Sequence, residues 1–184
     1  MQKIRLFGRS TAIAGAIMAI LGLDSALAQS QPNPVSPFPG GASSVSETYK
    51  DWSVSCVLQD AGKRCALTQT QTQQSGQRVL AIELNAPNGN RLAGVLVLPF
   101  GLALDSGATL QIDDKPPGQP LRFRTCLPAG CLIPLDFDAA MISALRSGTA
   151  LKVKVQADGG KETTLSISLQ GFPAALDRTA ALSR

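Results

Sequence analysis

Four cysteines and no histidine define the chemistry open to this chain of 184 residues. Without histidine, the chain lacks the side chain that most often transfers protons near neutral pH. Redox cysteines usually form a Cys-X-X-Cys pair at the start of a helix, and zinc knuckles use similarly close pairs. Here eight residues separate Cys56 from Cys65, and four separate Cys126 from Cys131. We therefore expect all four cysteines to form structural disulfides, with no metal-binding or redox role.

Two pairs of aspartates are the remaining candidates for acid–base chemistry. Asp136 and Asp138 are two residues apart, so on a strand they would share one face, as a pair of catalytic carboxylates requires. Asp138, however, also stands directly before a helical pattern, where aspartate commonly caps the helix. Asp113 and Asp114 precede the turn-forming Lys-Pro-Pro-Gly at 115–118. We interpret both pairs as structural and expect no catalytic residue.

A third feature is a pair of arginines, Arg122 and Arg124, on either side of Phe123. On a strand their side chains would lie on one face and could attract an anion. The solvated outer face of a sheet explains the same pattern, and both interpretations stay open. No serine has a histidine base, and no glycine-rich loop has a phosphate-binding signature. We expect no cofactor.

The N-terminus has the layout of a secretory signal. Lys3, Arg5 and Arg9 precede an apolar run at 11–23. Ala26-Leu27-Ala28 then offers small side chains at the positions that signal peptidase reads, so we expect residues 1–28 to be removed. The apolar run has about 13 residues, whereas a membrane span needs about 20. We therefore expect no stable membrane span after signal removal.

Removal of the signal leaves roughly 156 residues, enough for one domain with a hydrophobic core. It takes away three of the seventeen Lys and Arg and one of the thirteen Asp and Glu, so the net charge falls from +4 to +2. Because the remaining basic residues are scattered, we expect no nucleic-acid partner. Residues 29–46 are rich in Pro, Gly and Ser, which predicts a flexible tether before a single domain at 47–184.

Period-two alternation of apolar residues dominates the rest of the chain. Such alternation indicates antiparallel sheets with one buried and one solvated face. The run at 92–98 is apolar throughout, which predicts a strand covered on both sides. The alternating segments lie at 52–58, 80–84, 110–112, 121–123, 151–155 and 165–169.

One segment instead has helical spacing. Met141, Ile142 and Leu145 would share a helix face, with Asp138 as the N-cap and Gly148 as the stop. A second short helix is predicted to begin near Pro173. The fold class that follows is all-β, mainly an antiparallel β-sandwich or an irregular barrel, with one or two short helices.

The strand pattern also suggests how the cysteines pair. If 52–58 and 64–71 form a hairpin around 59–62, Cys56 lies opposite Cys65, and Val54 lies opposite Leu67 on the same apolar face. Cys126 and Cys131 would close a shorter loop. Four cysteines allow three connectivities. We favour the local pairing, and the crossed pairings stay open.

Several segments together resemble the opening and later motifs of the invasion-associated locus B family. The similarity extends over residues 49–176, and it depends on the order of the motifs more than on any one of them. The segments are Asp51-Trp52-Ser53-Val54-Ser55-Cys56 with Cys65; Leu98-Pro99-Phe100-Gly101-Leu102 with Asp105-Ser106-Gly107 and Ile112-Asp113; 123–126 with Gly130-Cys131; and Gln170-Gly171-Phe172.

The resemblance implies a bacterial exported protein, periplasmic, envelope-associated or secreted, from a family named for a link to host-cell invasion. It implies no enzymatic activity, cofactor or binding residue. We therefore expect a non-catalytic protein whose partner is an envelope or host protein. Two alternatives remain: a carboxylate-based hydrolase of envelope polymers, and a periplasmic holdase or assembly factor with an exposed apolar groove or a bare edge strand.

Overall fold

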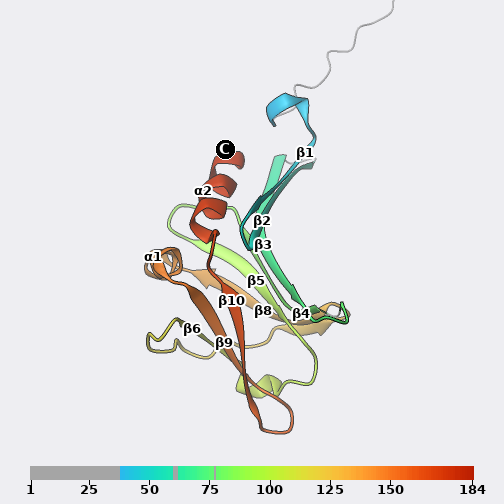
Figure 1. Ribbon diagram of the computed structural model, residues 1–184, viewed down its shortest axis with the longest axis vertical. Coiled ribbons are helices and arrows are strands. Elements are labelled where there is room, and N and C mark those ends of the chain that lie inside the picture. The colour runs from blue at the N-terminus through green and yellow to red at the C-terminus, as the bar shows by residue number, and fades with distance from the viewer. Residues whose placement is uncertain (1–37, 60–61, 77) are drawn as a thin grey trace, which may run out of the picture. The chain divides into compact units, whose positions relative to one another are not determined.

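The computed structural model describes residues 38–59, 62–76 and 78–184. The predicted signal at 1–28 and the first part of the predicted tether, 29–37, lie outside these residues. The described part forms two antiparallel sheets and two α-helices (Figure 1). None of its helices is long and apolar enough to cross a membrane.

The larger sheet has seven strands in the order β1-β2-β3-β4-β5-β8-β7, and the smaller has three in the order β10-β9-β6. Two separate sheets with antiparallel pairing confirm the all-β class, and within the described residues they form a sandwich. The strands are β1 (Ser44–Tyr49), β2 (Trp52–Gln59), β3 (Gly62–Thr72), β4 (Arg78–Asn85), β5 (Leu92–Leu98), β6 (Ala108–Ile112), β7 (Thr125–Leu127), β8 (Gly130–Phe137), β9 (Ala150–Gln156) and β10 (Glu162–Ser168). The helices are α1 (Ala139–Ser147) and α2 (Phe172–Leu182), with short 3-10 turns η1 (Pro39–Gly41) and η2 (Leu104–Ser106).

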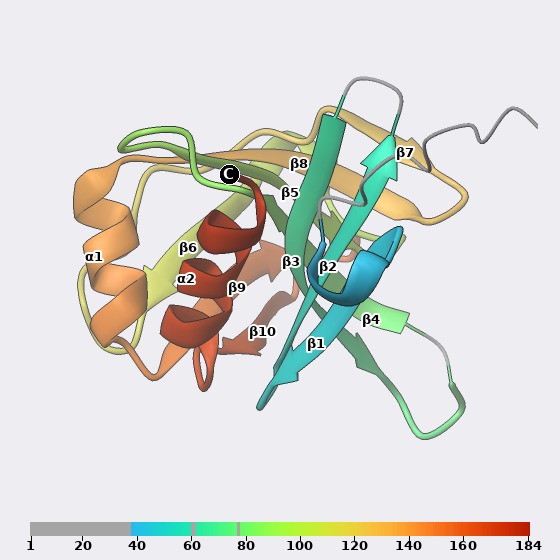
Figure 2. The same ribbon diagram turned by 90° about the horizontal axis from the view of Figure 1, so that it is seen from above.

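Alternating side chains place one hydrophobic core against a single face of the seven-stranded sheet. In β2, Trp52, Val54 and Cys56 are buried while the residues between them are exposed. The smaller sheet contributes its own buried alternation, as at Val153 in β9. All of these residues belong to one cluster. The three-stranded sheet and both helices therefore cover the same side of the larger sheet (Figure 2).

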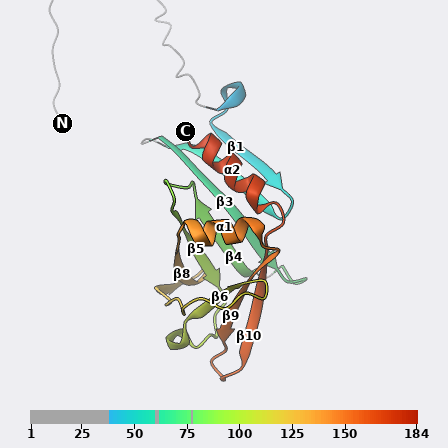
Figure 3. The ribbon, with the colours of Figure 1, turned by 90° about the vertical axis from the view of Figure 1, so that its left-hand side faces the viewer.

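The helices begin and end as their sequences predict. Asp138 caps α1 by accepting a hydrogen bond from the Met141 N–H at 2.8 Å, and Gly148 follows its last turn. Helix α2 has Pro173 in its first turn and packs on β1, β2 and β3 (Figure 3). Its Phe172 ring meets Trp52 edge-on, with centroids 5.1 Å apart.

Gly171, just before α2, lies where the chain passes very close to β1. Its φ is +87°, a left-handed conformation that L-residues with a side chain adopt only at a cost. A Cβ at this position would lie 2.0 Å from the Tyr49 carbonyl oxygen. The Gly-Phe step in the sequence is therefore required by the docking of α2.

Side chains of the larger sheet hydrogen-bond to the edge of the smaller one. Gln69, only 5% exposed, donates to the Ser168 carbonyl at 2.9 Å and accepts from the Ser168 N–H at 3.1 Å. The Trp52 indole donates to the same carbonyl, and Gln71 donates to the Ser166 carbonyl. The C-terminal end of the free β10 edge, at Ser166 and Ser168, is thus bonded inside the molecule.

The structure corrects two local predictions. The tether was expected to extend to residue 46, but β1 begins at Ser44 and pairs with β2, and Phe38 is buried. The ordered part starts earlier because Val45 packs against the core and β1 gains a full ladder of backbone hydrogen bonds. The expected strand at 121–123 is wrong: only Leu121 forms an isolated bridge, with Ala108.

The prediction that 92–98 form a strand covered on both sides is confirmed only in part. These residues do form β5, with Leu92, Leu96 and Leu98 buried in the core. On the opposite face, Ala93 is exposed, and Val95 and Val97 are only partly buried. The strand is therefore covered on one side, and an apolar outer face remains.

Candidate functional site

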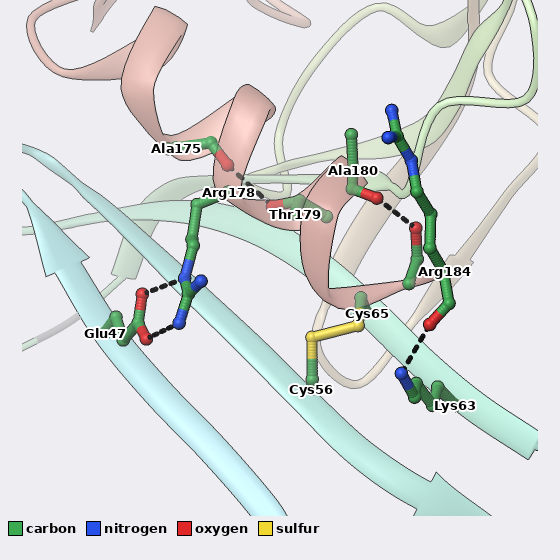
Figure 4. Close-up of a disulfide and its surroundings, with 10 residues drawn as sticks. Glu47, Cys56, Lys63, Cys65, Ala175, Arg178, Thr179, Ala180 and Arg184 are labelled. Atoms are coloured by element: carbon green, nitrogen blue, oxygen red, sulfur yellow. Dashed lines mark hydrogen bonds and ion pairs between the residues drawn. A yellow bond between two sulfur atoms is a disulfide. The ribbon is translucent and has the colours of Figure 1, made fainter. Parts of the chain in front are cut away.

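All four cysteines form disulfides in the structure. Cys56 is bonded to Cys65 across β2 and β3 (Figure 4), and Cys126 is bonded to Cys131 across β7 and β8. Both bonds join directly opposite residues of a hairpin, with Cα atoms 4.1 and 3.9 Å apart. The register also pairs Val54 with Leu67. This is the local pairing that the hairpin pattern predicts, and it leaves no thiol for chemistry.

The aspartates considered for catalysis each have a partner. Asp136 forms an ion pair with Arg91, and Asp138 caps α1. Asp113 accepts hydrogen bonds from the N–H groups of Thr149 and Ala150. Asp113 therefore links the end of β6 to the start of β9.

Asp136 and Asp138 nevertheless line one groove, of about 430 Å³, beside the apolar residues Leu110, Phe137 and Met141. In this groove the carboxylates lie on the outer face of β8 and at the start of α1. Asp136 is held by its ion pair with Arg91, and Asp138 is held at the N-terminus of α1. We therefore interpret both carboxylates as structural.

Ion pairs elsewhere in the described chain engage three of the arginines. Arg91 pairs with Asp136, Arg146 with Asp177, and Arg178 with Glu47. The last pair joins α2 to β1 (Figure 4). The Arg178 guanidinium, and after it the Tyr49 hydroxyl, lower the pKa of the Glu47 carboxyl to about 2.

Arg122 and Arg124 differ from those arginines. Neither guanidinium has an ion-pair or hydrogen-bond partner among residues 38–59, 62–76 and 78–184. Both side chains are exposed, while Phe123 between them is partly buried against the core. The interpretation of an outward-facing arginine pair therefore fits the structure, although the segment is no regular strand.

The two arginines line a surface groove of about 390 Å³, which we call the arginine groove. One wall is η2, in the loop between β5 and β6, and the other is the segment that leads into β7. The leucine in η2 is 43% exposed, and Phe100, in the same loop, is 61% exposed. The groove is lined by Leu104, Asp105, Arg122, Phe123, Arg124 and Thr125.

Part of the main chain along the groove has no backbone hydrogen-bond partner in the described chain. Leu121 is held by its bridge to Ala108, and the Arg124 N–H donates to the Leu132 carbonyl. Within the described part of the chain, the N–H and C=O groups of Arg122 and Phe123 bond to no other backbone group. The segment continues into β7, which is an edge strand of the larger sheet.

Sequence reasoning found the arginines of this groove but missed its opposite wall. Leu104 and Asp105 lie about 17 residues earlier in the chain and gave no periodic signal. The signal that was available is Pro99-Phe100-Gly101, a turn sequence with an aromatic residue, in a segment that the family resemblance had already marked. An exposed aromatic on a turn is more informative than a buried one.

Comparison with known proteins identifies the relatives of this fold. Residues 52–180 match the family described as Invasion associated locus B (IalB) protein. The Invasion protein B homolog of Brucella abortus (strain 2308) is 49% identical over 148 residues, which cover 79% of this chain and 85% of the relative. Invasion protein B of Bartonella bacilliformis is 33% identical over 153 residues, covering 82% of each chain.

A solved structure has the same fold. The crystal structure of invasion associated protein b from Bartonella henselae superposes with a TM-score of 0.70 at 32% identity. The match covers 75% of this chain and 96% of that one.

Proposed function

This chain belongs to the invasion associated locus B (IalB) protein family, and from that premise we propose that it is an exported binding domain. It acts through contact with another protein, in the cell envelope or on a host cell, and catalyses no reaction. The names of its relatives, Invasion protein B among them, support contact with a host.

The arginine groove is the observation that carries the proposal. Two guanidinium groups without a partner among the described residues, an exposed leucine, and main-chain groups likewise without backbone partners there meet on one surface. Arginine is enriched at protein–protein interfaces and among the residues that dominate their binding energy. By contrast, the cysteines and Asp113, Asp136 and Asp138 already serve the fold.

Two features support export. Disulfides form and persist in oxidising compartments such as the bacterial periplasm, and both cysteine pairs are bonded. The predicted signal at 1–28 agrees with that compartment. We therefore propose a periplasmic, envelope-associated or secreted location.

The two alternatives have weaker support. A carboxylate hydrolase would have to use Asp136 and Asp138, whose partners are Arg91 and the α1 N-terminus. A holdase would use a bare edge or an apolar face, and the outer face around Val95, Val97 and Leu132 offers a half-buried one. That face is not purely apolar, because exposed Glu83 lies directly opposite Val95 and exposed Asp136 opposite Ala93.

Site-specific photocrosslinking tests the proposal. A photoreactive amino acid at Leu104 reports on the groove, and the same amino acid at exposed Thr72, at the end of β3, is the control. We expect a discrete adduct with one second protein from position 104 in intact cells, and none from position 72. The adduct should disappear in the Arg122→Gln/Arg124→Gln variant.

Fractionation of the same cells gives the location. The proposal fails if position 104 yields only the free chain in envelope, periplasmic and secreted fractions and in contact with host cells. It also fails if the adduct survives removal of both arginines.

A further inference from the structure

We propose that the arginine groove binds a short, extended, acidic peptide segment that carries at least one large apolar side chain. The inference rests on the proposed function and specifies the chemistry of the partner. Three independent features of the groove contribute, namely its charge, its apolar wall and its open main chain.

Charge selects an acidic ligand. Arg122 and Arg124 offer two guanidinium groups, and Asp105 is the single acidic residue among the six that line the groove. An arginine fork binds a carboxylate through two parallel hydrogen bonds. Since neither arginine has an intramolecular partner in the described chain, a ligand displaces no existing ion pair.

The apolar wall selects a ligand that also has a large hydrophobic side chain. Leu104, which lines the groove, is 43% exposed. Phe123 adds a partly buried ring to the lining. A leucine or phenylalanine of the ligand, placed between two carboxylates, would cover this wall while its neighbours reach the arginines.

The main chain favours a peptide over a lipid surface. The N–H and C=O groups of Arg122 and Phe123 are free of backbone partners in the described part of the chain. An extended peptide can pair with them as an added strand beside the edge of the sheet, whereas lipid headgroups match no such spacing.

Fluorescence anisotropy with synthetic peptides tests the inference on the oxidised protein purified from the exporting cells. The probe is a labelled ten-residue peptide that alternates Glu with Leu and Phe. Its analogues replace Glu by Gln, Glu by Lys, or the apolar residues by Ser. We expect saturable binding of the acidic apolar peptide, at least about tenfold weaker binding of each analogue, and weaker binding at high salt.

Variants of the protein make the test specific. Arg122→Gln/Arg124→Gln should weaken binding about tenfold or more, and the lysine pair Arg122→Lys/Arg124→Lys should restore part of it because charge returns without the fork. The matched control Lys50→Gln/Arg64→Gln removes the same charge from the β1–β3 region and should change affinity less than about twofold. Circular dichroism checks that each variant is folded.

Each other result overturns the inference in a distinguishable way. An equal loss in the control variant would mean that net charge alone attracts the peptide. Binding to phosphatidylglycerol vesicles, but to no peptide, would assign the groove to a lipid surface. If no peptide binds while the crosslink at position 104 persists, the peptide chemistry is wrong and the proposed function stands; if the crosslink is absent too, both fail.

Discussion

At the scale of single residues, Glu47 is an ionised group that joins two elements of the described fold. Its carboxylate accepts hydrogen bonds from Arg178 at 2.7 and 2.8 Å and from Tyr49 at 2.7 Å, which joins β1 to α2. These donors hold its pKa at about 2, below the ordinary value of 4.5. Because the folded pKa is lowered, the pair stabilises the fold above pH 4.5, and that contribution is lost as the pH falls toward 2.

We therefore expect Glu47→Gln to lower the free energy of unfolding at pH 7, and the difference from the parent protein to shrink between pH 4.5 and 2. Urea unfolding at several pH values measures this difference in the free energy of unfolding. Glu83→Gln, on an exposed glutamate outside the four ion pairs of the described chain, is the control and should show no such convergence. A constant difference across the range would contradict the role of the ionised pair.

Gly171 gives a second prediction at this scale. Alanine there would combine a left-handed backbone with a Cβ 2.0 Å from the Tyr49 carbonyl oxygen. We expect Gly171→Ala to lower the free energy of unfolding by at least about 2 kcal/mol. Gly159→Ala, in an open turn with nothing within 4 Å, should change it by less than about 0.5 kcal/mol. Similar thermal unfolding midpoints for the two variants would rule out the close approach.

At the scale of elements, the junction between the sheets depends on Gln69. Gln69→Leu would leave the Ser168 N–H without its partner in a largely buried place. We expect the free energy of unfolding to fall by about 1–3 kcal/mol. Gln73→Leu, in the exposed turn after β3, should be nearly neutral. If hydrogen exchange at the Ser168 amide stays as slow in Gln69→Leu as in the parent, this contact is not what protects the β10 edge.

The two disulfides cross-link different hairpins and should contribute different amounts to the free energy of unfolding. In the chain-entropy account each is worth about 2–3 kcal/mol, more for the longer loop. Cys56 and Cys65 are nine residues apart and both buried, whereas Cys126 and Cys131 are five apart and Cys126 is partly exposed. We expect Cys56→Ala/Cys65→Ala to destabilise the protein more than Cys126→Ala/Cys131→Ala, measured by urea unfolding. The reverse order would contradict this account.

Most elements could be predicted because their pattern is local. The β2–β3 hairpin, α1 with its Asp138 cap, and α2 with Pro173 in its first turn all follow from spacing within about ten residues. β1 was hidden because a strand of mostly serine, threonine and glutamate, after a run of prolines, has little apolar alternation to detect. β8 was missed because Pro134 and the cysteine loop interrupt its pattern.

The candidate site, too, could be predicted from the sequence only where its pattern is local. Arg122 and Arg124 stand out in the sequence because they are close together, whereas Leu104 joins them only after the chain has folded. The segment 121–123 was expected to be a strand, and its irregular main chain leaves Arg122 and Phe123 without backbone partners in the described part of the chain. Local patterns cannot reveal this, because it depends on where β6 and β8 hold the segment.

At the scale of the whole molecule, the predicted signal can be tested on the exported protein. We expect cleavage after Ala28, so that the mature chain starts at Gln29, because small residues stand at the two positions that the peptidase reads. Intact-mass measurement of the exported protein checks the site. Ala28→Tyr should block cleavage and leave the heavier form, and Gln31→Tyr, beyond the cleavage point, should not. A mature form that begins elsewhere would contradict the assignment.

The order in which the sulfurs pair has a consequence for biogenesis. The first cysteine along the chain is joined to the second, and the third is joined to the fourth. A polypeptide that emerges N-terminus first can therefore seal each bridge as soon as its second thiol arrives, before later segments are present. We therefore expect oxidation alone to form both bridges as the chain is exported, without later rearrangement of wrong linkages.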